Sequence, residues 1–80
     1  MILRNANLEE VDFTSTDLTS ARLERAVLDQ ANLTFTHLEA AQLAGASMFK
    51  TFGFRTNLSR ADLTGANMSF AELYRADFST

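Results

Sequence analysis

The sequence has 80 residues, which is enough for one domain at most and for only a modest buried core. The formal net charge of −3 is too small to identify a partner, and the absence of cysteine excludes disulfides and thiolate metal sites. No segment approaches the roughly 20 apolar residues of a membrane span, and no signal peptide is recognisable. We therefore expect a single domain over residues 1–80, no membrane span and, by default, a cytoplasmic location.

The chain divides into five-residue units that keep one register from Met1 to Thr80. The first position is alanine in ten of the sixteen units and threonine in four, and the second is Asp or Asn in eight. Polar residues dominate the fourth and fifth positions. The third position is large and apolar in fifteen of sixteen units, the exception being Gly53. Its occupants are Leu3, Leu8, Phe13, Leu18, Leu23, Leu28, Leu33, Leu38, Leu43, Met48, Gly53, Leu58, Leu63, Met68, Leu73 and Phe78.

A period of five excludes both a helix and a continuous flat strand. Five residues advance a helix by about 500°, so the apolar positions would not form a stripe. In a strand, positions one and three share a face, but the next position one lies three residues further on and would face the opposite way. Both positions can point inward only if the chain turns a corner once per unit. The repeat therefore predicts a β-solenoid, in which a large and a small inward residue alternate.

Units such as ANLEE, ANLTF, ADLTG, ANMSF and ADFST resemble the pentapeptide-repeat family, whose pattern is A(D/N)LXX. The resemblance extends over the whole chain without insertion. It implies an all-β fold, a right-handed quadrilateral β-helix with four repeats in each coil and about four coils here. In this family the centre residue and the small residue two before it point inward, which agrees with the periodicity.

Polar residues along the chain have architectural explanations. Residues 1–40 carry three arginines and seven carboxylates, and residues 41–80 carry four basic and three acidic residues. We interpret the acidic run Glu9, Glu10 and Asp12 as a solvated face and His37 as a solvated or side-chain-paired histidine. Asp17, His37, Asn57 and Asp77 are expected to align on one side of the coil as part of the architecture.

Gly53 interrupts the third position and leaves two interpretations open. With twenty residues per coil it would stack between Leu33 and Leu73, where glycine leaves a gap about the size of a leucine side chain. A local bulge could move Phe52 or Phe54 into this gap. Alternatively, both phenylalanines stay outside and flank a shallow dent.

Aromatic side chains at nominally outward positions form a candidate contact surface. Stacking at intervals of twenty residues predicts Phe54 beside Tyr74 and Phe35 beside Arg55 and Arg75, with Phe49, Lys50 and Phe70 near the same corner. Aromatic and arginine side chains are enriched in protein-binding hot spots, so we expect a protein partner here. Self-association, cover by a missing segment and the absence of any role are the alternatives. The candidate contact residues are Phe35, Phe49, Phe52, Phe54, Phe70, Tyr74, Arg55 and Arg75.

The ends of the repeat array start and stop in register, with no predicted cap. Solenoid ends expose unpaired strand edges and a bare core, and terminal repeats are usually atypical for this reason. Either the chain is excised from a longer protein or its ends meet another subunit. In several family members phenylalanine at the large site accumulates near a dimer-forming end, so Phe78 is a candidate for end-to-end homodimer contact.

No motif for catalysis, nucleotide binding or metal binding is present, and we expect no catalytic residues, no cofactor and no metal. The function predicted is that of a non-catalytic rigid scaffold or protein–protein interaction module. The alternative is a DNA mimic, because some family members are acidic rods that bind DNA gyrase and inhibit or protect it. Direct nucleic-acid binding is not expected from an acidic chain.

Overall fold

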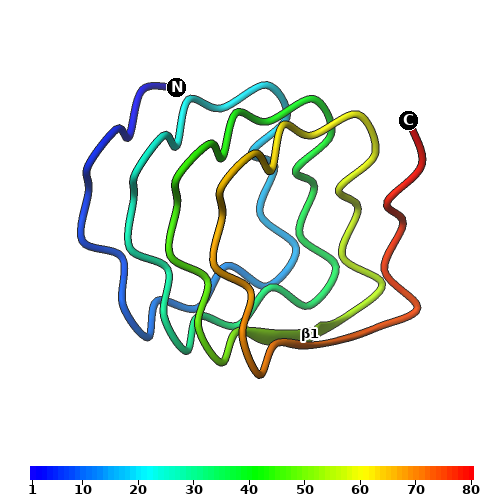
Figure 1. The fold of residues 1–80 in the computed structure, drawn as a ribbon. Coiled ribbons are helices and arrows are strands. Elements are labelled where there is room, and N and C mark those ends of the chain that lie inside the picture. The colour runs from blue at the N-terminus through cyan, green and yellow to red at the C-terminus, as the bar shows by residue number, and fades with distance from the viewer.

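The computed structural model describes residues 1–80 as one continuous coil (Figure 1). All of its β-bridges are parallel, and they join residues twenty apart, from Ile2 with Arg22 to Asn57 with Asp77. One turn of the coil therefore takes twenty residues, or four five-residue units. This arrangement confirms the predicted β-solenoid. We number its sides in chain order, so that side three consists of residues 11–15, 31–35, 51–55 and 71–75.

Each unit ends in a tight turn that makes a corner. In the first unit the amide of Ala6 donates to the carbonyl of Leu3 at 3.1 Å, and equivalent bonds recur along the chain. The fifth residue of every unit from Asn5 to Arg75 has a positive φ, between 55° and 69°. A left-handed residue at the second central position of a β-turn reverses the chain within four residues. The corner predicted once per unit is confirmed.

Asp and Asn at the second position hold these corners. In all eight such units the side-chain Oδ1 accepts a hydrogen bond from the backbone amide two residues further on. Asp12 and Thr14 are one example, at 2.9 Å, and Asn57 and Ser59 are another, at 2.9 Å. Asp and Asn favour this local bond because their short side chains reach the backbone ahead of them. The preference at position two thus has a structural cause.

The core consists of the third and first positions, as the periodicity predicts. Fourteen apolar residues from Phe13 to Leu58 form one buried cluster, and half-buried residues of the outer turns, such as Leu3 and Leu73, pack against it. Threonine replaces alanine at some first positions, and its buried hydroxyl then needs a partner. The hydroxyl of Thr36 donates to the carbonyl of Phe13 at 2.9 Å, and that of Thr56 donates to the carbonyl of Leu33 at 2.6 Å.

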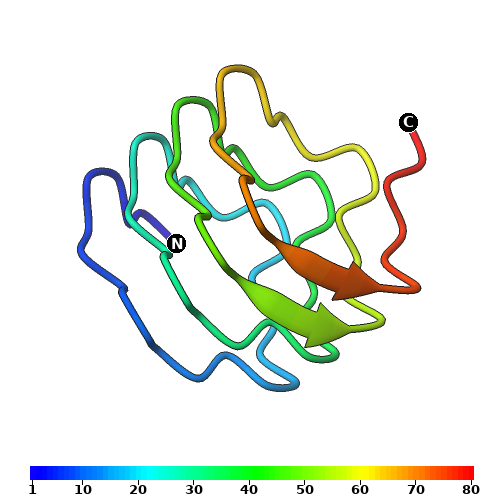
Figure 2. The ribbon, with the colours of Figure 1, turned by 60° about the horizontal axis from the view of Figure 1, so that its bottom comes forward.

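Two short strands mark side three: β1 (Phe52–Phe54) and β2 (Glu72–Tyr74). They pair in parallel, with Phe52 opposite Glu72 and Phe54 opposite Tyr74, and lie side by side in Figure 2. Gly53 is inward and buried, while Phe52 and Phe54 are 44% and 39% exposed. The interpretation in which a bulge moves one of these phenylalanines into the core is therefore wrong.

The expectation of a leucine-sized gap at Gly53 is also wrong, because the backbone at Gly53 lies close to the backbone of Leu33 and Thr34. A Cβ built on Gly53 would lie 2.7 Å from the carbonyl carbon of Leu33 and 2.9 Å from the amide nitrogen of Thr34. No side chain fits at that distance, so glycine is required by the path of the chain. The structure contains no helix of the length and apolarity that crossing a membrane requires.

Candidate protein-interaction surface

Exposed aromatic side chains gather on side three and at its two corners. We call Phe35, Phe49, Phe52, Phe54, Phe70 and Tyr74 the aromatic strip. Phe70 and Tyr74 are the most exposed members, at 76% and 61%, whereas Phe49 is half-buried. Because Phe52 and Phe54 lie two residues apart on β1, their side chains leave the same face of the strand.

One end of the strip lies at the carboxyl ends of β1 and β2 and is built around Phe54. The rings of Phe35 and Phe54 meet edge to face, with centroids 6.1 Å apart and an interplanar angle of 87°. The guanidinium carbons of Arg55 and Arg75 lie 5.5 Å and 6.0 Å from the centre of the Phe54 ring. Cations within about 6 Å of a ring centre are attracted by the face of the ring. Tyr74 is the register partner of Phe54, as expected from the twenty-residue spacing.

The other end precedes the strands and is built around Phe49. Phe49 and Phe70 also meet edge to face, with centroids 5.8 Å apart, and the Nζ of Lys50 lies 5.3 Å from the centre of the Phe49 ring. The expectation that these residues share a corner with Phe54 is wrong, because a full side of the coil separates the two groups. Two clusters therefore bound side three, with Phe52 between them.

A single open groove of about 870 Å³ lies at the corner between sides two and three. Phe52 and Phe70 supply its aromatic walls. Its other lining residues are Glu10, Gln30, Lys50, Ala71 and Glu72. Glu10, Gln30, Lys50 and Phe70 are twenty residues apart in the sequence, so the stacking interval could have identified this column. Glu10, Gln30 and Glu72 are neighbours of the aromatic residues that were not expected from the sequence.

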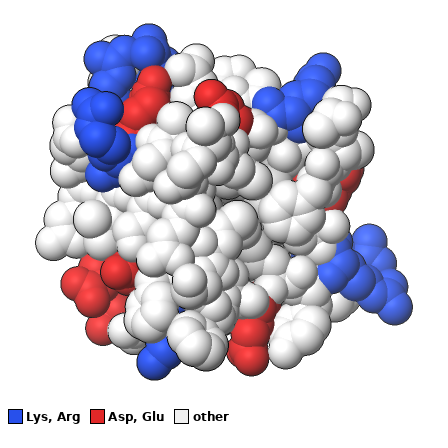
Figure 3. Space-filling model, viewed as in Figure 1, with Lys and Arg blue, Asp and Glu red and all other residues white.

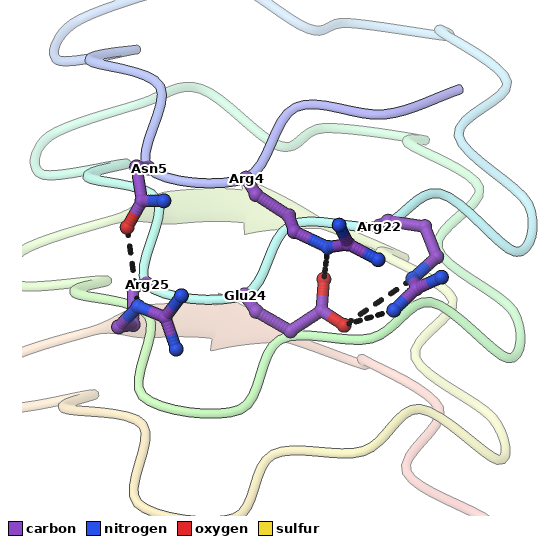
Figure 4. Close-up of polar contacts among 5 residues, drawn as sticks. All are labelled: Arg4, Asn5, Arg22, Glu24 and Arg25. Atoms are coloured by element: carbon purple, nitrogen blue, oxygen red, sulfur yellow. Dashed lines mark hydrogen bonds and ion pairs between the residues drawn. The ribbon is translucent and has the colours of Figure 1, made fainter.

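The basic residues of the two halves have different surroundings. Glu24 pairs with Arg22 at 3.0 Å and with Arg4 at 3.5 Å, and Arg25 donates to the amide oxygen of Asn5 at 3.1 Å (Figure 4). In contrast, no carboxylate lies within 4.0 Å of the basic groups of the second half, which are Lys50, Arg55, Arg60 and Arg75. Several basic side chains project from the edges of the molecule in Figure 3, around a largely uncharged face.

Hydrogen bonds at the corners also set the charge of several carboxylates. The hydroxyl and amide of Thr14 lower the pKa of Asp12, and those of Thr64 lower the pKa of Asp62. Thr19 lowers the pKa of Asp17 in the same way. Donors that bind the ionised form favour it over the protonated acid. The ionised form of these carboxylates is therefore favoured more than in a free aspartate.

The remaining candidate residues have architectural surroundings. Asp17, His37, Asn57 and Asp77 follow one another in parallel bridges, so their predicted alignment on side four is confirmed. The Nδ1 of His37 lies 3.3 Å from Glu39. No three His, Asp or Glu side chains gather in a way that could hold a metal ion. Phe78 occupies an inward position in the last unit but is 48% exposed, because no further turn covers it within residues 1–80.

Parallel turns built from five-residue units define the chain as a repeat protein of the β-solenoid class. The model of the family described as pentapeptide repeats matches residues 1–30 and 55–79, with eight copies. The chain belongs to the pentapeptide-repeat family. The unmatched residues 31–54 include Gly53, yet the parallel bridges continue through them. Members of this family are generally non-catalytic repeat proteins.

Three solved structures illustrate the relationship. The pentapeptide repeat protein alr5209 from Nostoc Pcc 7120 is 32% identical, with a TM-score of 0.57, over 89% of this chain and 70% of that protein. Rfr23 from the cyanobacterium Cyanothece 51142 is 31% identical (TM-score 0.46; 95% of this chain and 58% of that one). HetL from Nostoc sp. strain PCC 7120, which is involved in heterocyst differentiation regulation, is 29% identical (TM-score 0.39; 89% and 44%). A comparison with curated proteins gives no match.

Proposed function

We propose that this protein is a non-catalytic, rigid scaffold that binds a protein partner through the aromatic strip and the adjoining Arg55 and Arg75. The observation that carries the proposal is the exposure of four aromatic side chains on adjacent turns: Phe52, Phe54, Phe70 and Tyr74. Large exposed apolar patches with arginine are typical of binding surfaces and uncommon on idle ones.

Rigidity supports this role. Backbone hydrogen bonds connect each turn to the next, for example from the amide of Leu33 to the carbonyl of Phe52 at 2.7 Å and from Phe35 to Phe54 at 2.9 Å. Outward side chains are therefore held at fixed spacings, which reduces the entropy lost on binding. The proposed scaffold is the right-handed quadrilateral form with four coils; the twenty-residue spacing of the bridges supports four sides and four coils.

An experiment on the strip tests the proposal. Phe54→Ser combined with Tyr74→Ser should abolish co-purification of the partner from the native organism while circular dichroism stays unchanged, because both side chains are exposed. Ile2→Ser is the matched control, since Ile2 is 70% exposed and lies on side one. Unchanged partner recovery by the folded double variant would remove the strip as the contact surface.

Self-association through the last turn is the second part of the proposal, and Phe78 is its candidate contact. Phe78 is half-exposed beside other partly buried apolar side chains of the last turn, including Met68 and Leu73. Stacking another subunit there would cover these side chains and pair the exposed strand edges. Phe78→Ser should then convert a dimer into a monomer in analytical ultracentrifugation, and a monomeric parent protein would exclude this contact.

A DNA mimic that binds DNA gyrase is the alternative function. Its support is the charge of the first turn. Residues 1–20 contain four acidic residues, Glu9, Glu10, Asp12 and Asp17, and only one basic residue, Arg4. The third turn opposes it, because residues 41–60 carry three basic residues and no acidic one. A supercoiling assay distinguishes the two functions: a DNA mimic inhibits or protects gyrase at micromolar protein, whereas the scaffold has no effect.

A further inference from the structure

In the third turn of the coil, two exposed aromatic rings on side three have a basic residue at the corner before them and another at the corner after them. The order along the chain is Lys50, Phe52, Phe54 and Arg55, with Gly53 turned into the core. Phe52 and Phe54 leave the same face of β1 and are 44% and 39% exposed. The cations occupy the corners before and after the strand, so their charges lie on opposite sides of the aromatic pair.

These charges are available to a partner. Residues 41–60 carry Lys50, Arg55 and Arg60 and no acidic residue, and no carboxylate lies within 4.0 Å of any of the three. Earlier in the chain, by contrast, Arg4 and Arg22 share Glu24. Cations without internal partners attract complementary charge and steer its approach.

The acidic residues nearby restrict where a partner can carry negative charge. Glu72 on β2 is the register partner of Phe52, and Glu10 lines the groove together with Lys50 and Phe52. A uniformly acidic partner would be repelled by these two carboxylates. Glu72 adjoins Phe52 and so disfavours negative charge in the middle of the segment. Glu10 lies two turns from Lys50 in the same corner column and weakens the attraction at that end. Negative charge on the partner therefore belongs at the two ends of the segment, most strongly at the Arg55 end, and an apolar stretch belongs in its middle.

We infer that side three binds an extended protein segment with an apolar middle and carboxylates at both ends. Its middle lies on Phe52 and Phe54, one end meets Lys50, and the other meets Arg55 and Arg75. The two guanidinium groups are held over the Phe54 ring, at 5.5 Å and 6.0 Å, and are thus oriented before binding. This inference rests on the proposed scaffold function and specifies the chemistry of the partner.

A labelled peptide tests the inference by fluorescence anisotropy. The probe is fluorescein-labelled Glu-Glu-Val-Leu-Val-Glu-Glu, and Lys-Lys-Val-Leu-Val-Lys-Lys is its charge-reversed control. We expect the acidic peptide to bind and the basic one not to, with affinity falling as salt is raised. Arg55→Glu should weaken binding about tenfold or more, because Arg55 adjoins the strip.

Arg60→Glu is the matched control for charge. It produces the same change in net charge at the fifth position of the same turn, but one corner further on, and should alter the affinity less than about twofold. Equal losses in both variants, or no binding of the acidic peptide, overturn the inference. Tighter binding of a single-stranded oligothymidylate than of the acidic peptide also overturns it and assigns the surface to nucleic acid.

The two proposals fail in different ways. If the native partner is lost from the variant carrying Phe54→Ser and Tyr74→Ser but retained by Arg55→Glu, the scaffold function stands and the acidic-ended segment is excluded. If Phe54→Ser with Tyr74→Ser retains the partner, the strip itself is excluded. Circular dichroism of each variant establishes that the coil is folded.

Discussion

The backbone of Gly53 packs directly against the backbone of Leu33 on the preceding turn. An added Cβ would come within 2.7 Å of the Leu33 carbonyl carbon, and both neighbouring atoms of the 33–34 peptide lie at 3.0 Å or less. Backbone atoms in a hydrogen-bonded ladder cannot move aside as a flexible side chain can. Glycine at this position therefore determines how closely turns two and three approach on side three.

Gly53→Ala should consequently destabilise the protein more than any other glycine replacement. We expect a loss of about 2–3 kcal/mol in the free energy of unfolding, the usual cost of overpacking. Gly65→Ala is the control, since its Cβ meets nothing closer than 3.9 Å, although its φ of 69° adds a strain of about 1 kcal/mol. Urea unfolding followed by circular dichroism measures both. Equal stability of the two variants would contradict the close approach.

Burial depth along one inward column should determine the cost of truncating its leucines. Leu33 is fully buried, whereas Leu73, at the same position in the last turn, is only half-buried. Leu33→Ala should cost about 3 kcal/mol in the free energy of unfolding, through lost transfer energy and the cavity left behind. Leu73→Ala should cost less than half as much. A larger loss at Leu73 than at Leu33 in urea titrations would contradict the assignment of the core.

The sequence predicts this fold well because one repeated constraint acts sixteen times. Inward first and third positions require a corner in each unit, and the observed corners and buried columns agree. Gly53 is different because a periodic argument keeps the backbone at a fixed spacing, so that a missing side chain predicts a gap. In the structure the backbone at Gly53 instead approaches the 33–34 peptide closely, which no periodicity reveals.

The aromatic strip was predicted residue by residue but not contact by contact. Stacking at twenty residues places Phe54 opposite Tyr74 correctly. The ring contacts, however, join Phe35 with Phe54 and Phe49 with Phe70, at separations of nineteen and twenty-one residues. The rotamer of a long side chain determines which neighbour on the next turn it contacts. For the same reason the sequence could not show that Glu24 pairs with two arginines while Arg55 pairs with no carboxylate.

The carboxylates at the corners make stability depend on pH. Hydrogen bonds from Thr14 and Thr64 lower the pKa of Asp12 and Asp62 in the folded protein below the unfolded value. A lowered folded pKa contributes stability that is fully present above the unfolded pKa, near pH 4, and lost as the pH falls through the folded pKa. The urea midpoint should thus decline below about pH 4.

A double replacement isolates this contribution. Asp12→Asn with Asp62→Asn keeps the Oδ1 acceptor that other corners, such as Asn57 with Ser59, already use. The variant should fold at neutral pH and show a shallower decline of the urea midpoint in acid. If the parent and the variant lose stability equally between pH 5 and pH 2, the corner carboxylates are not the origin of acid sensitivity.

The left-handed fifth position offers a route to higher stability. Ser20 is exposed and has a φ of 61°, a left-handed conformation that is strained for a residue with a Cβ. Ser20→Gly should raise the free energy of unfolding by about 0.5 kcal/mol, the relief of left-handed strain less the greater entropy of glycine when unfolded. Ser59→Gly is the control at a fourth position without positive φ and should be destabilising by a similar amount. If the two variants shift the urea midpoint in the same direction, the conformational argument is wrong.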